Sequence, residues 1–401
     1  MRPFLRLVQP LLALACAVVT VVSCDDRMQD LESHADLTAP SPRSGAPPDA
    51  RPRGWDQSPF GVSGIRYDPG QEAAGDALID SLARGAATGG WVRLAFYWNE
   101  IQRAAPWWPQ IWYPHGFIEP VARFKKHGVK VYGSIEGSAY WATSYYRKDP
   151  NYFRHPPDNL DDWRKYVQAV VDSFPDVDAW GIWNEPNDTN FFKVPDGQDA
   201  ALEYARLVSI AAPIIHAAGK PVVVGEIAWA PATLGKNKTD RDVRDWVARM
   251  MRHITVTFGQ TVEILAVHHY GATVDNINVA DVRVPLMYAE NPDLPWSKWE
   301  VWLSEFANAS GYNDDGPAAD KDIEKQIVDM FAHLTGPSKR NPYWKKAFYY
   351  NLADTGGGRR NLVRNWEIAR ATNNPSLLRY RSPFAAYRQI LATGGQSLRN
   401  R

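Results

Sequence analysis

The stretch Trp180-Gly181-Ile182-Trp183-Asn184-Glu185-Pro186-Asn187 decides how this sequence is interpreted. It is a run of apolar β-formers that ends in a carboxylate. The later stretch Trp302-Leu303-Ser304-Glu305-Phe306-Ala307 follows the same pattern. A carboxylate at the end of an apolar strand is costly to bury unless it has a use. Two such groups on two strands therefore predict one active site with a pair of carboxylates.

Short apolar segments alternate with amphipathic segments from about Phe60 onward. This alternation is typical of parallel strands joined by helical crossovers. Strands are predicted at 60–65, 91–97, 129–135, 178–184, 221–227, 263–269, 300–305 and 346–352. Helices are predicted near 76–87, 117–127, 160–173, 199–218, 240–255, 278–290, 319–334 and 383–392. Gly128 and Gly219 stand where helix C-caps belong, just before strands.

Eight repeats of this unit fit a closed (β/α)₈ TIM barrel, which we predict as a single catalytic domain over residues 57–401. In such a barrel the active residues lie at the C-terminal ends of the strands. Glu185 then ends the fourth strand and Glu305 the seventh. An open, doubly wound sheet is the alternative. No Gly-rich phosphate loop follows the first predicted strand, which disfavours that alternative.

The composition is compatible with one large domain and a neutral substrate. The chain has 401 residues, of which 45% are hydrophobic. Basic and acidic side chains are equal in number, at 45 each. A net charge of zero argues against nucleic acid as a partner. We expect most of the 17 Trp residues in the core, with a minority lining a cleft where they stack on sugar rings. We also expect a monomer.

The N-terminus has the features of an export signal. Arg2 and Arg6 precede a short apolar stretch at 11–22, which is too short to span a bilayer comfortably. The segment Val21-Val22-Ser23-Cys24 resembles the bacterial lipobox. That resemblance implies a lipoprotein signal peptide over residues 1–23, cleavage before Cys24, and lipidation of its thiol.

Residues 24–56 are predicted to be a disordered tether that begins at the lipidated Cys24. They are rich in Pro and have little apolar periodicity. We expect an extracytoplasmic lipoprotein anchored to a membrane, or a secreted protein if the signal is an ordinary one and Cys24 is not lipidated. Cys16, the other cysteine, lies within the signal, so the mature chain is expected to have no disulfide.

The two glutamate segments together resemble clan A glycoside hydrolases. The hallmark of that clan is Asn-Glu-Pro after the fourth strand, here Asn184-Glu185-Pro186, and a second glutamate after the seventh, here Glu305. The resemblance covers roughly residues 58–393. The segment 182–192, followed by a long helix and Val222-Val223-Val224-Gly225, is most similar to family 39, with family 5 as the nearest competitor.

This resemblance implies roles for the two glutamates. Glu185 would be the acid/base, which protonates the leaving oxygen and later activates water. Glu305 would be the nucleophile and must stay ionised. An apolar wall of Trp180 and Trp183 is expected to raise the pKa of Glu185. Two carboxylates and water suffice for this chemistry, so we expect no cofactor and no metal.

Four polar residues would support this pair. Arg93 matches the clan's arginine in the second strand and would supply positive charge to the nucleophile. Tyr270 matches a tyrosine that donates a hydrogen bond to the nucleophile, and His268 shares its face of the sixth strand by the period of two. Asn184 would bind the 2-hydroxyl of the sugar at the cleavage point.

Aromatic residues near other strand ends are candidates for sugar contacts. Trp141 matches an aromatic that is common after the third strand in the clan. Many clan members have a Trp at the end of the eighth strand, whereas this chain offers Tyr349, Tyr350 and Asn351. We take Tyr350 as the substrate-binding candidate there. The aromatic loop at 107–113 is either a sugar-stacking rim or a hydrophobic lid.

Several of these residues have structural alternatives. Arg93 is alternatively part of a buried structural ion pair, and His268 and Tyr270 are alternatively ordinary barrel residues. The adjacent pair His268-His269 suggests a metal site, but neighbours on a strand point opposite ways and no HExxH pattern accompanies them. Glu136 and Glu226 also lie near strand ends, where we interpret them as supporting or sugar-binding groups.

The sequence therefore predicts a retaining glycoside hydrolase. It would cleave O-glycosidic bonds of a poly- or oligosaccharide by double displacement through a glycosyl-enzyme intermediate. The two carboxyls are then expected about 5 Å apart. Two alternatives stay open on the same barrel: a non-catalytic polysaccharide-binding or assembly lipoprotein, and a transglycosylase.

Overall fold

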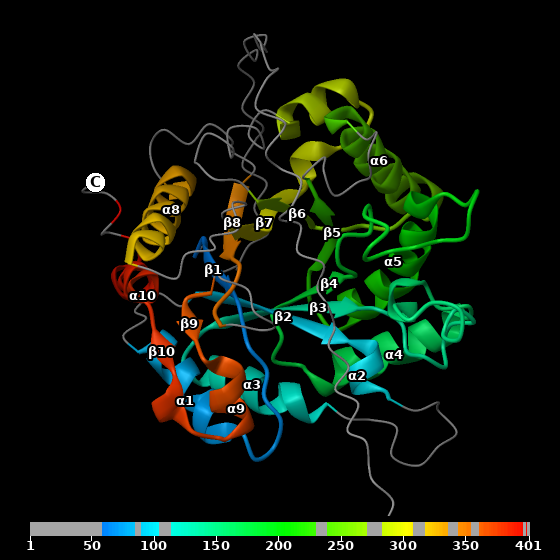
Figure 1. Cartoon of the computed structure of the whole chain (residues 1–401). Coiled ribbons are helices and arrows are strands. Elements are labelled where there is room, and N and C mark those ends of the chain that lie inside the picture. Colours follow the sequence, from blue (N-terminus) through cyan, green and yellow to red (C-terminus); the bar gives the residue numbers. More distant parts are fainter. Residues whose placement is uncertain are drawn as a thin grey trace, which may run out of the picture.

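Eight parallel strands close into a barrel in the computed structural model of this chain (Figure 1). The structure describes residues 58–84, 90–103, 114–229, 239–270, 283–307, 317–335, 344–353, 361–395 and 398. The strands are β1 (Phe60–Ser63), β2 (Trp91–Tyr97), β3 (Lys130–Glu136), β4 (Ala179–Ile182), β5 (Val222–Ala228), β6 (Ile264–Tyr270), β7 (Glu300–Ala307) and β8 (Trp344–Tyr349). Because β1 pairs with both β2 and β8, the predicted (β/α)₈ barrel is confirmed and the open sheet is excluded.

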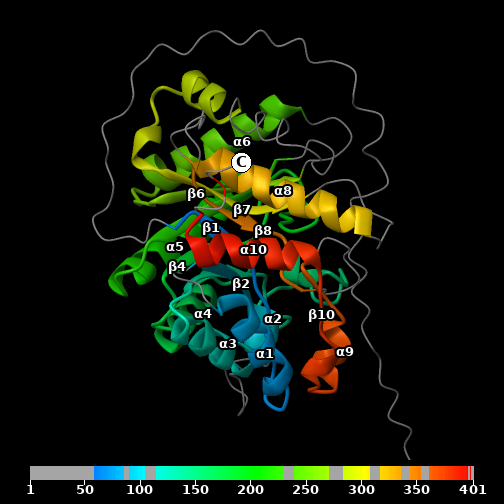
Figure 2. The same ribbon diagram turned by 90° about the vertical axis from the view of Figure 1, so that its left-hand side faces the viewer.

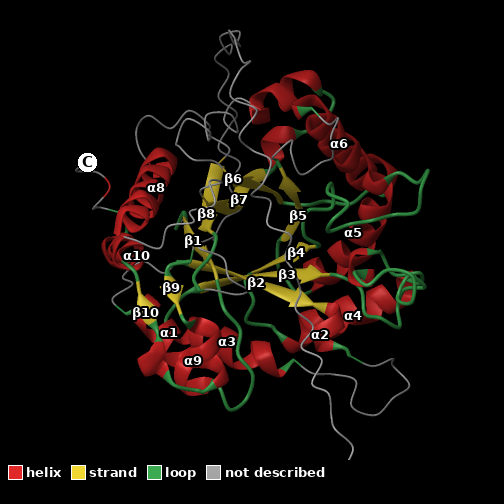
Figure 3. Ribbon diagram, viewed as in Figure 1, coloured by secondary structure: helices red, strands yellow, loops and turns green. Residues whose placement is uncertain are grey.

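Helices form a ring around the strands (Figure 3). They are α1 (Glu72–Ala83), α2 (Trp98–Ile101), α3 (His115–Lys126), α4 (Leu160–Ser173), α5 (Ala200–Ala217), α6 (Asp240–Arg252), α8 (Pro317–Thr335), α9 (Trp366–Ala371) and α10 (Ser382–Thr393). Short turns of other helix types are η2 (Tyr152–Arg154), η4 (His253–Thr257), η5 (Trp296–Lys298) and η6 (Pro375–Leu377). Among the described residues, no helix combines the length and the apolar character needed to cross a membrane.

Local capping explains why several helices begin and end where they do. Asn159 precedes α4 and accepts a hydrogen bond from the backbone of Asp161. Thr239 and Asp242 form a reciprocal capping box at the start of α6. Helix α10 ends at Gly394, which adopts a left-handed conformation. These devices satisfy backbone groups that helix ends would otherwise leave unpaired.

Aromatic side chains fill the barrel interior below the C-terminal ends of the strands. Trp302 from β7 is central: its ring centroid lies 5.1 Å from that of Trp91, 5.7 Å from Tyr132 and 5.9 Å from Phe348. The ammonium group of Lys346 lies 4.5 Å from the centre of the Trp91 ring. This interior cluster, with aliphatic residues from β4 to β6, forms a closed floor instead of a pore.

Two bulges interrupt the strand registers near the top of the barrel. Between β5 and β6 the pairing slips from Val224 to Ile227, and between β6 and β7 it slips at Val267 and His268. Gly225 in the first bulge has φ +97°, and a Cβ there would lie 2.9 Å from the Ala266 carbonyl oxygen. A bulge changes the direction in which the following side chain points. Glu226 lies within the first bulge, and Glu305 directly follows the second.

The C-terminal third departs most from prediction. A small antiparallel sheet of β9 (Val363–Arg364) and β10 (Arg379–Tyr380) lies outside the barrel, with α9 between its strands in sequence. Helices α8 and α10 run side by side, as Figure 2 shows, and join through the rings of Phe331 and Tyr387. The predicted signal, Cys24, the tether and the loop at 107–113 lie outside the described residues.

Candidate active site

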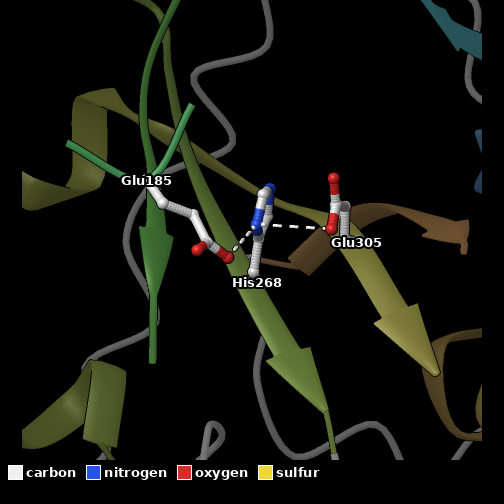
Figure 4. Close-up of side chains that lie close together, drawn as sticks. All are labelled: Glu185, His268 and Glu305. Carbon is white, nitrogen blue, oxygen red and sulfur yellow. Dashed lines mark hydrogen bonds and ion pairs between the residues drawn. The ribbon is translucent and has the colours of Figure 1, made fainter. Parts of the chain in front are cut away.

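Glu185 and Glu305 lie on either side of one imidazole at the C-terminal end of the barrel (Figure 4). Nδ1 of His268 is 2.7 Å from Oε1 of Glu185 and 3.5 Å from Oε2 of Glu305. One oxygen of each carboxyl and this imidazole nitrogen all lie within 4.8 Å of one another. Glu185 is 8% exposed and Glu305 is 7% exposed. The fold therefore brings the two distant glutamates together, at a separation that agrees with the expected 5 Å.

Burial controls the protonation of Glu185. Loss of water raises the pKa of its carboxyl, the hydrogen bond and charge of His268 oppose that rise, and the charge of Glu305 adds to it. The net direction is upward, as an acid catalyst requires. Trp183 and Glu185 both have positive φ, at 65° and 42°. Such backbone strain in non-glycine residues is typical of functional sites.

Donors from two strands surround the carboxylate of Glu305. Nη1 of Arg93, on β2, donates to Oε1 at 3.0 Å. The hydroxyl of Tyr270, on β6, donates to Oε2. Both contacts are those that the clan resemblance implies for a nucleophile. Charge-assisted hydrogen bonds of this kind fix the position and the plane of the carboxyl group.

Arg93 is the hub of this site. Besides Glu305, its guanidinium contacts Glu226 through Nε at 2.7 Å and Nη2 at 2.5 Å. Nη2 also lies 3.0 Å from Oε1 of Glu136 and 3.0 Å from Oδ1 of Asn184. Arg93 thus joins Glu305 to a buried ion-pair network, which combines the functional role with the structural alternative.

The two additional carboxyls carry different charges. Burial raises the pKa of Glu136 to about 8, although Arg93 opposes this. Burial also acts to raise the pKa of Glu226, but the charge and hydrogen bonds of Arg93 outweigh it and the pKa is lowered. Tyr132 and Ser134 donate to Glu226 as well, at 2.5 and 3.1 Å. At neutral pH we therefore assign the charge to Glu226 and the proton to Glu136.

Three carboxyls act on the protonation of His268. Burial acts to lower the pKa of its imidazole, but Glu305, Glu185 and Glu226 outweigh that effect and raise it. Its Nε2 is buried and has no hydrogen-bond partner among the described residues. The imidazole therefore lies between the two candidate catalytic carboxyls, which favour its protonated form.

The predicted wall of Trp180 and Trp183 is wrong. Ala179 and Gly181 face the barrel interior, so Trp180 points outward, where it packs on Phe96. Trp183 is 1% exposed and packs between Trp163 of α4 and Phe192. It supports the loop that carries Glu185 from behind. The raised pKa of Glu185 comes from general burial, not from these rings.

Of the other predicted residues, Tyr350 and Asn184 contact the site, whereas Trp141, which follows β3 in the sequence, contacts α2 and Gln102. Tyr350 is half-buried, with its ring 6.2 Å from that of Tyr270. Trp141 is also half-buried and packs edge-on against Trp98 of α2, and its Nε1 donates to the Gln102 carbonyl. Asn184 is half-buried next to Arg93. Each is partly accessible, as a sugar contact must be.

Sequence reasoning missed Tyr132 and Ser134. Both lie on β3 and face inward with Glu136, and both donate to Glu226. Their signal was the period of two along 130–136, which places alternate residues on one face. The contact with Glu226 needed the bulge in β5, which that period does not show.

The cluster of Glu185, His268 and Glu305 is the one group among the described residues whose ligand atoms are close enough to share a metal ion. The facing atoms of these residues already hold hydrogen bonds or ion pairs with one another, with Arg93 and with Tyr270. An ion would have to displace these contacts. The arrangement can transfer protons and attack an electrophile with protein groups alone.

A family comparison decides the class of this protein. The model of the glycosyl hydrolase catalytic core matches residues 154–370, a stretch that contains both Glu185 and Glu305. This chain belongs to the glycosyl hydrolase catalytic core family. Among curated proteins, none matches the sequence. The predicted enzyme class, a glycoside hydrolase, is thus confirmed. Placement of this glycosyl hydrolase in family 39 stays a prediction.

Solved structures of other glycoside hydrolases share the fold. A family 39 glycoside hydrolase from Bacteroides cellulosilyticus WH2 is 16% identical, with a TM-score of 0.53 over 86% of this chain. A glucosidase from Croceicoccus marinus is 15% identical (TM-score 0.57, 87%), and a monomeric β-xylosidase from Caulobacter crescentus CB15 is 15% identical (TM-score 0.56, 83%). This chain spans 64% of the first and 68% of the other two. At such identities the likeness extends to the fold alone.

Proposed function

We propose that this protein is a retaining glycoside hydrolase that cleaves a poly- or oligosaccharide by double displacement. The observation that carries the proposal is the distance between the two glutamates, whose facing oxygens lie within 4.8 Å of each other and of the His268 nitrogen. Retaining enzymes hold their carboxyls about 5–5.5 Å apart, whereas inverting enzymes need about 6.5–9.5 Å to admit a water. The short separation favours direct attack by a carboxylate.

In the first step the carboxylate of Glu305 attacks the anomeric carbon, and the bond between that carbon and the glycosidic oxygen breaks. Glu185 gives its proton to the departing oxygen, which leaves as an alcohol. Arg93 and Tyr270 hold the attacking carboxylate in place through the contacts described above. Positioning of this kind makes a large contribution to rate enhancement.

In the second step Glu185 acts as a base. Once Glu305 is esterified, its negative charge is gone, and with it one of the influences that raise the pKa of Glu185. Glu185 then takes a proton from water, whose oxygen attacks the anomeric carbon and releases Glu305 as a carboxylate. Because the configuration inverts twice, the product keeps that of the substrate. His268 hydrogen-bonds Glu185 in its carboxylate form.

The experiment that tests this proposal combines a substrate screen with product stereochemistry. The full chain is incubated with a panel of neutral polysaccharides, and proton NMR follows the anomer that is released first. We expect the anomer of the starting linkage. Release of the opposite anomer would contradict retention, and a chain without turnover on any polysaccharide or aryl glycoside would contradict the hydrolase itself.

A matched pair of variants tests whether Glu185 or the neighbouring Glu136 is the acid/base. Glu185→Ala should lower kcat by about 10²–10⁴-fold, less so for aryl glycosides with good leaving groups, and azide should restore turnover as a glycosyl azide. Glu136→Ala, which removes a neighbouring buried carboxyl, should show no azide rescue. If azide restored turnover in Glu136→Ala and not in Glu185→Ala, Glu136 would be the acid/base instead of Glu185.

We also propose that a lipid on Cys24 anchors the protein to a membrane outside the cytoplasm. The proposal is based on the lipobox-like segment 21–24 and the Pro-rich residues that follow. Cells that express the full chain should incorporate labelled palmitate into it, and Cys24→Ala should abolish the label and move the protein to the soluble fraction. Membrane retention of the unlabelled variant would contradict a lipid anchor.

A further inference from the structure

We infer that Glu226 is a positioning residue of the active site. It holds the guanidinium of Arg93 in place, and that guanidinium in turn orients the carboxylate of Glu305. This inference rests on the proposed function, since it assigns the nucleophile to Glu305. It extends that function by a residue on β5, a strand that contributes neither of the two proposed catalytic carboxyls.

The geometry of Arg93 carries this inference. Its Nε and Nη2 both point at the carboxylate of Glu226, at 2.7 and 2.5 Å, which is a bidentate pair. A bidentate pair fixes the plane of the guanidinium as well as its position. The remaining nitrogen, Nη1, then meets Glu305 at 3.0 Å. Glu226 therefore fixes one edge of the guanidinium, and this sets the direction in which Nη1 donates to Glu305.

The side chain of Glu226 is itself fixed by burial and by several hydrogen bonds. It is 1% exposed and accepts four hydrogen bonds from three side chains, two of them from Tyr132 and Ser134. Its backbone has φ 45°, a strained conformation for a residue with a side chain. The bulge at Gly225 turns this residue toward the barrel interior.

Glu136 does not provide the same constraint. It makes a single contact with the guanidinium, between its Oε1 and Nη2 at 3.0 Å, and it shares that nitrogen with Glu226 and Asn184. One hydrogen bond leaves the plane of the guanidinium free to turn. Of the two extra carboxyls, only Glu226 therefore has the geometry to position Arg93.

The first test is Glu226→Gln, measured on a substrate that the wild type cleaves. The amide offers an NH₂ group to one guanidinium nitrogen, which breaks the bidentate pair while the volume is kept. We expect kcat to fall about 100-fold, as a misplacement near 1 Å produces, with KM changed less than threefold. The matched control is Glu263→Gln, which alters a glutamate bonded to the Val222 backbone just before β6 and should keep activity within twofold.

A double-mutant cycle tests whether Glu226 acts through Arg93. Arg93→Lys keeps the positive charge but loses the pair of guanidinium donors that binds Glu226 in a bidentate way. If the inference holds, the double variant should be no slower than Arg93→Lys alone within about threefold, because both changes remove the same constraint. If the fold losses in kcat of the two single variants multiplied in the double variant, the inference would be overturned. A kcat of Glu226→Gln within threefold of the wild type would also overturn it.

Two further measurements keep the test valid if Glu226→Gln folds poorly. Tyr132→Phe removes one donor to Glu226 without touching Arg93, and it should lower kcat several-fold in the same direction. A crystal structure of either variant should show Nη1 of Arg93 withdrawn from Glu305, and an unchanged contact would overturn the inference. This structural result does not depend on turnover. A failure of the proposed function would be recognised separately, because the wild type would then be inactive.

Discussion

The two ends of the barrel interior differ in what their side chains do. The floor contains the interlocked rings of Trp91, Trp302 and Phe348, with Tyr132 above them. The mouth, a few residues further along the same strands, buries four carboxyl groups with Arg93 and His268. Trp302 and Glu305 lie three positions apart on β7. One strand thus passes from a region made for packing to one made for chemistry.

This contrast indicates how stability and activity are separated in the molecule. Buried aromatic surface stabilises the floor at about 25 cal/mol per Å² of apolar area removed from water. The mouth instead buries charges and holds Glu185 and Glu226 at strained φ values, both of which oppose folding. We therefore expect changes in the mouth to affect turnover first and changes in the floor to affect stability first.

The largest effect should follow from Glu305→Gln. Loss of the nucleophile should lower kcat by about 10⁴-fold or more. The melting temperature should stay near that of the wild type, because Arg93 keeps Glu226 as a partner. Circular dichroism and turnover on a confirmed substrate check the two parts. Ordinary activity in this variant would remove Glu305 from its proposed role.

The floor is best probed by Trp302→Ala. Trp302 is fully buried, and loss of such a ring costs about 3–5 kcal/mol of unfolding free energy. Urea unfolding measures this, with Val256→Ala as the control, since Val256 is 75% exposed and should change stability by less than about 0.5 kcal/mol. If Trp302→Ala instead abolished turnover with stability unchanged, the separation of floor and mouth would be lost.

His268→Ala should shift the pH dependence of turnover. His268 lowers the pKa of Glu185 against the upward effect of burial. Without the imidazole that pKa rises further, so the acid stays protonated to higher pH. The alkaline limb of kcat/KM should therefore move upward. His269→Ala, at the neighbouring position that points the other way on β6, should leave the limb in place.

The smallest effect is expected far from both regions, at the start of α6. Thr239→Ala removes the capping hydrogen bond to the Asp242 backbone and should cost about 1 kcal/mol of unfolding free energy. Thr239→Ser keeps the hydroxyl and should cost much less. Neither should alter kcat/KM. A change in turnover here would show that the helix ring and the mouth are coupled.

The sequence predicted the barrel well where local signals and tertiary structure agree. Strand β2 at 91–97 and helix α4 at 160–173 have the predicted bounds. The first is a clear apolar run, and the second begins at a strong Asn cap. Strand β8 begins at Trp344, two residues before its predicted start. It ends at Tyr349, earlier than predicted, because the apolar run continues through residues that no longer pair in the barrel.

The site was predictable in its residues and only partly in its directions. Glu185, Glu305, Arg93 and Tyr270 come together as the family resemblance implied, and His268 joins them on the face that the period of two along β6 predicted. Trp183 turned away because its φ is positive, which breaks the alternation of strand side chains. Glu226 joined Arg93 because of a bulge whose only sequence signal is Gly225. Backbone conformations of this kind depend on the surrounding fold, so one sequence does not reveal them.

We propose that Glu185 and Glu305 work as one pair across a single site. The most direct test of this proposal incubates the full-length wild type with a 2-deoxy-2-fluoro glycoside of the sugar it cleaves, followed by mass spectrometry of its peptides. We predict a covalent sugar on the peptide that contains Glu305, and none when the probe meets Glu305→Gln. An adduct on Glu136 or Glu226, or turnover without an adduct and with inverted product, would contradict the claim.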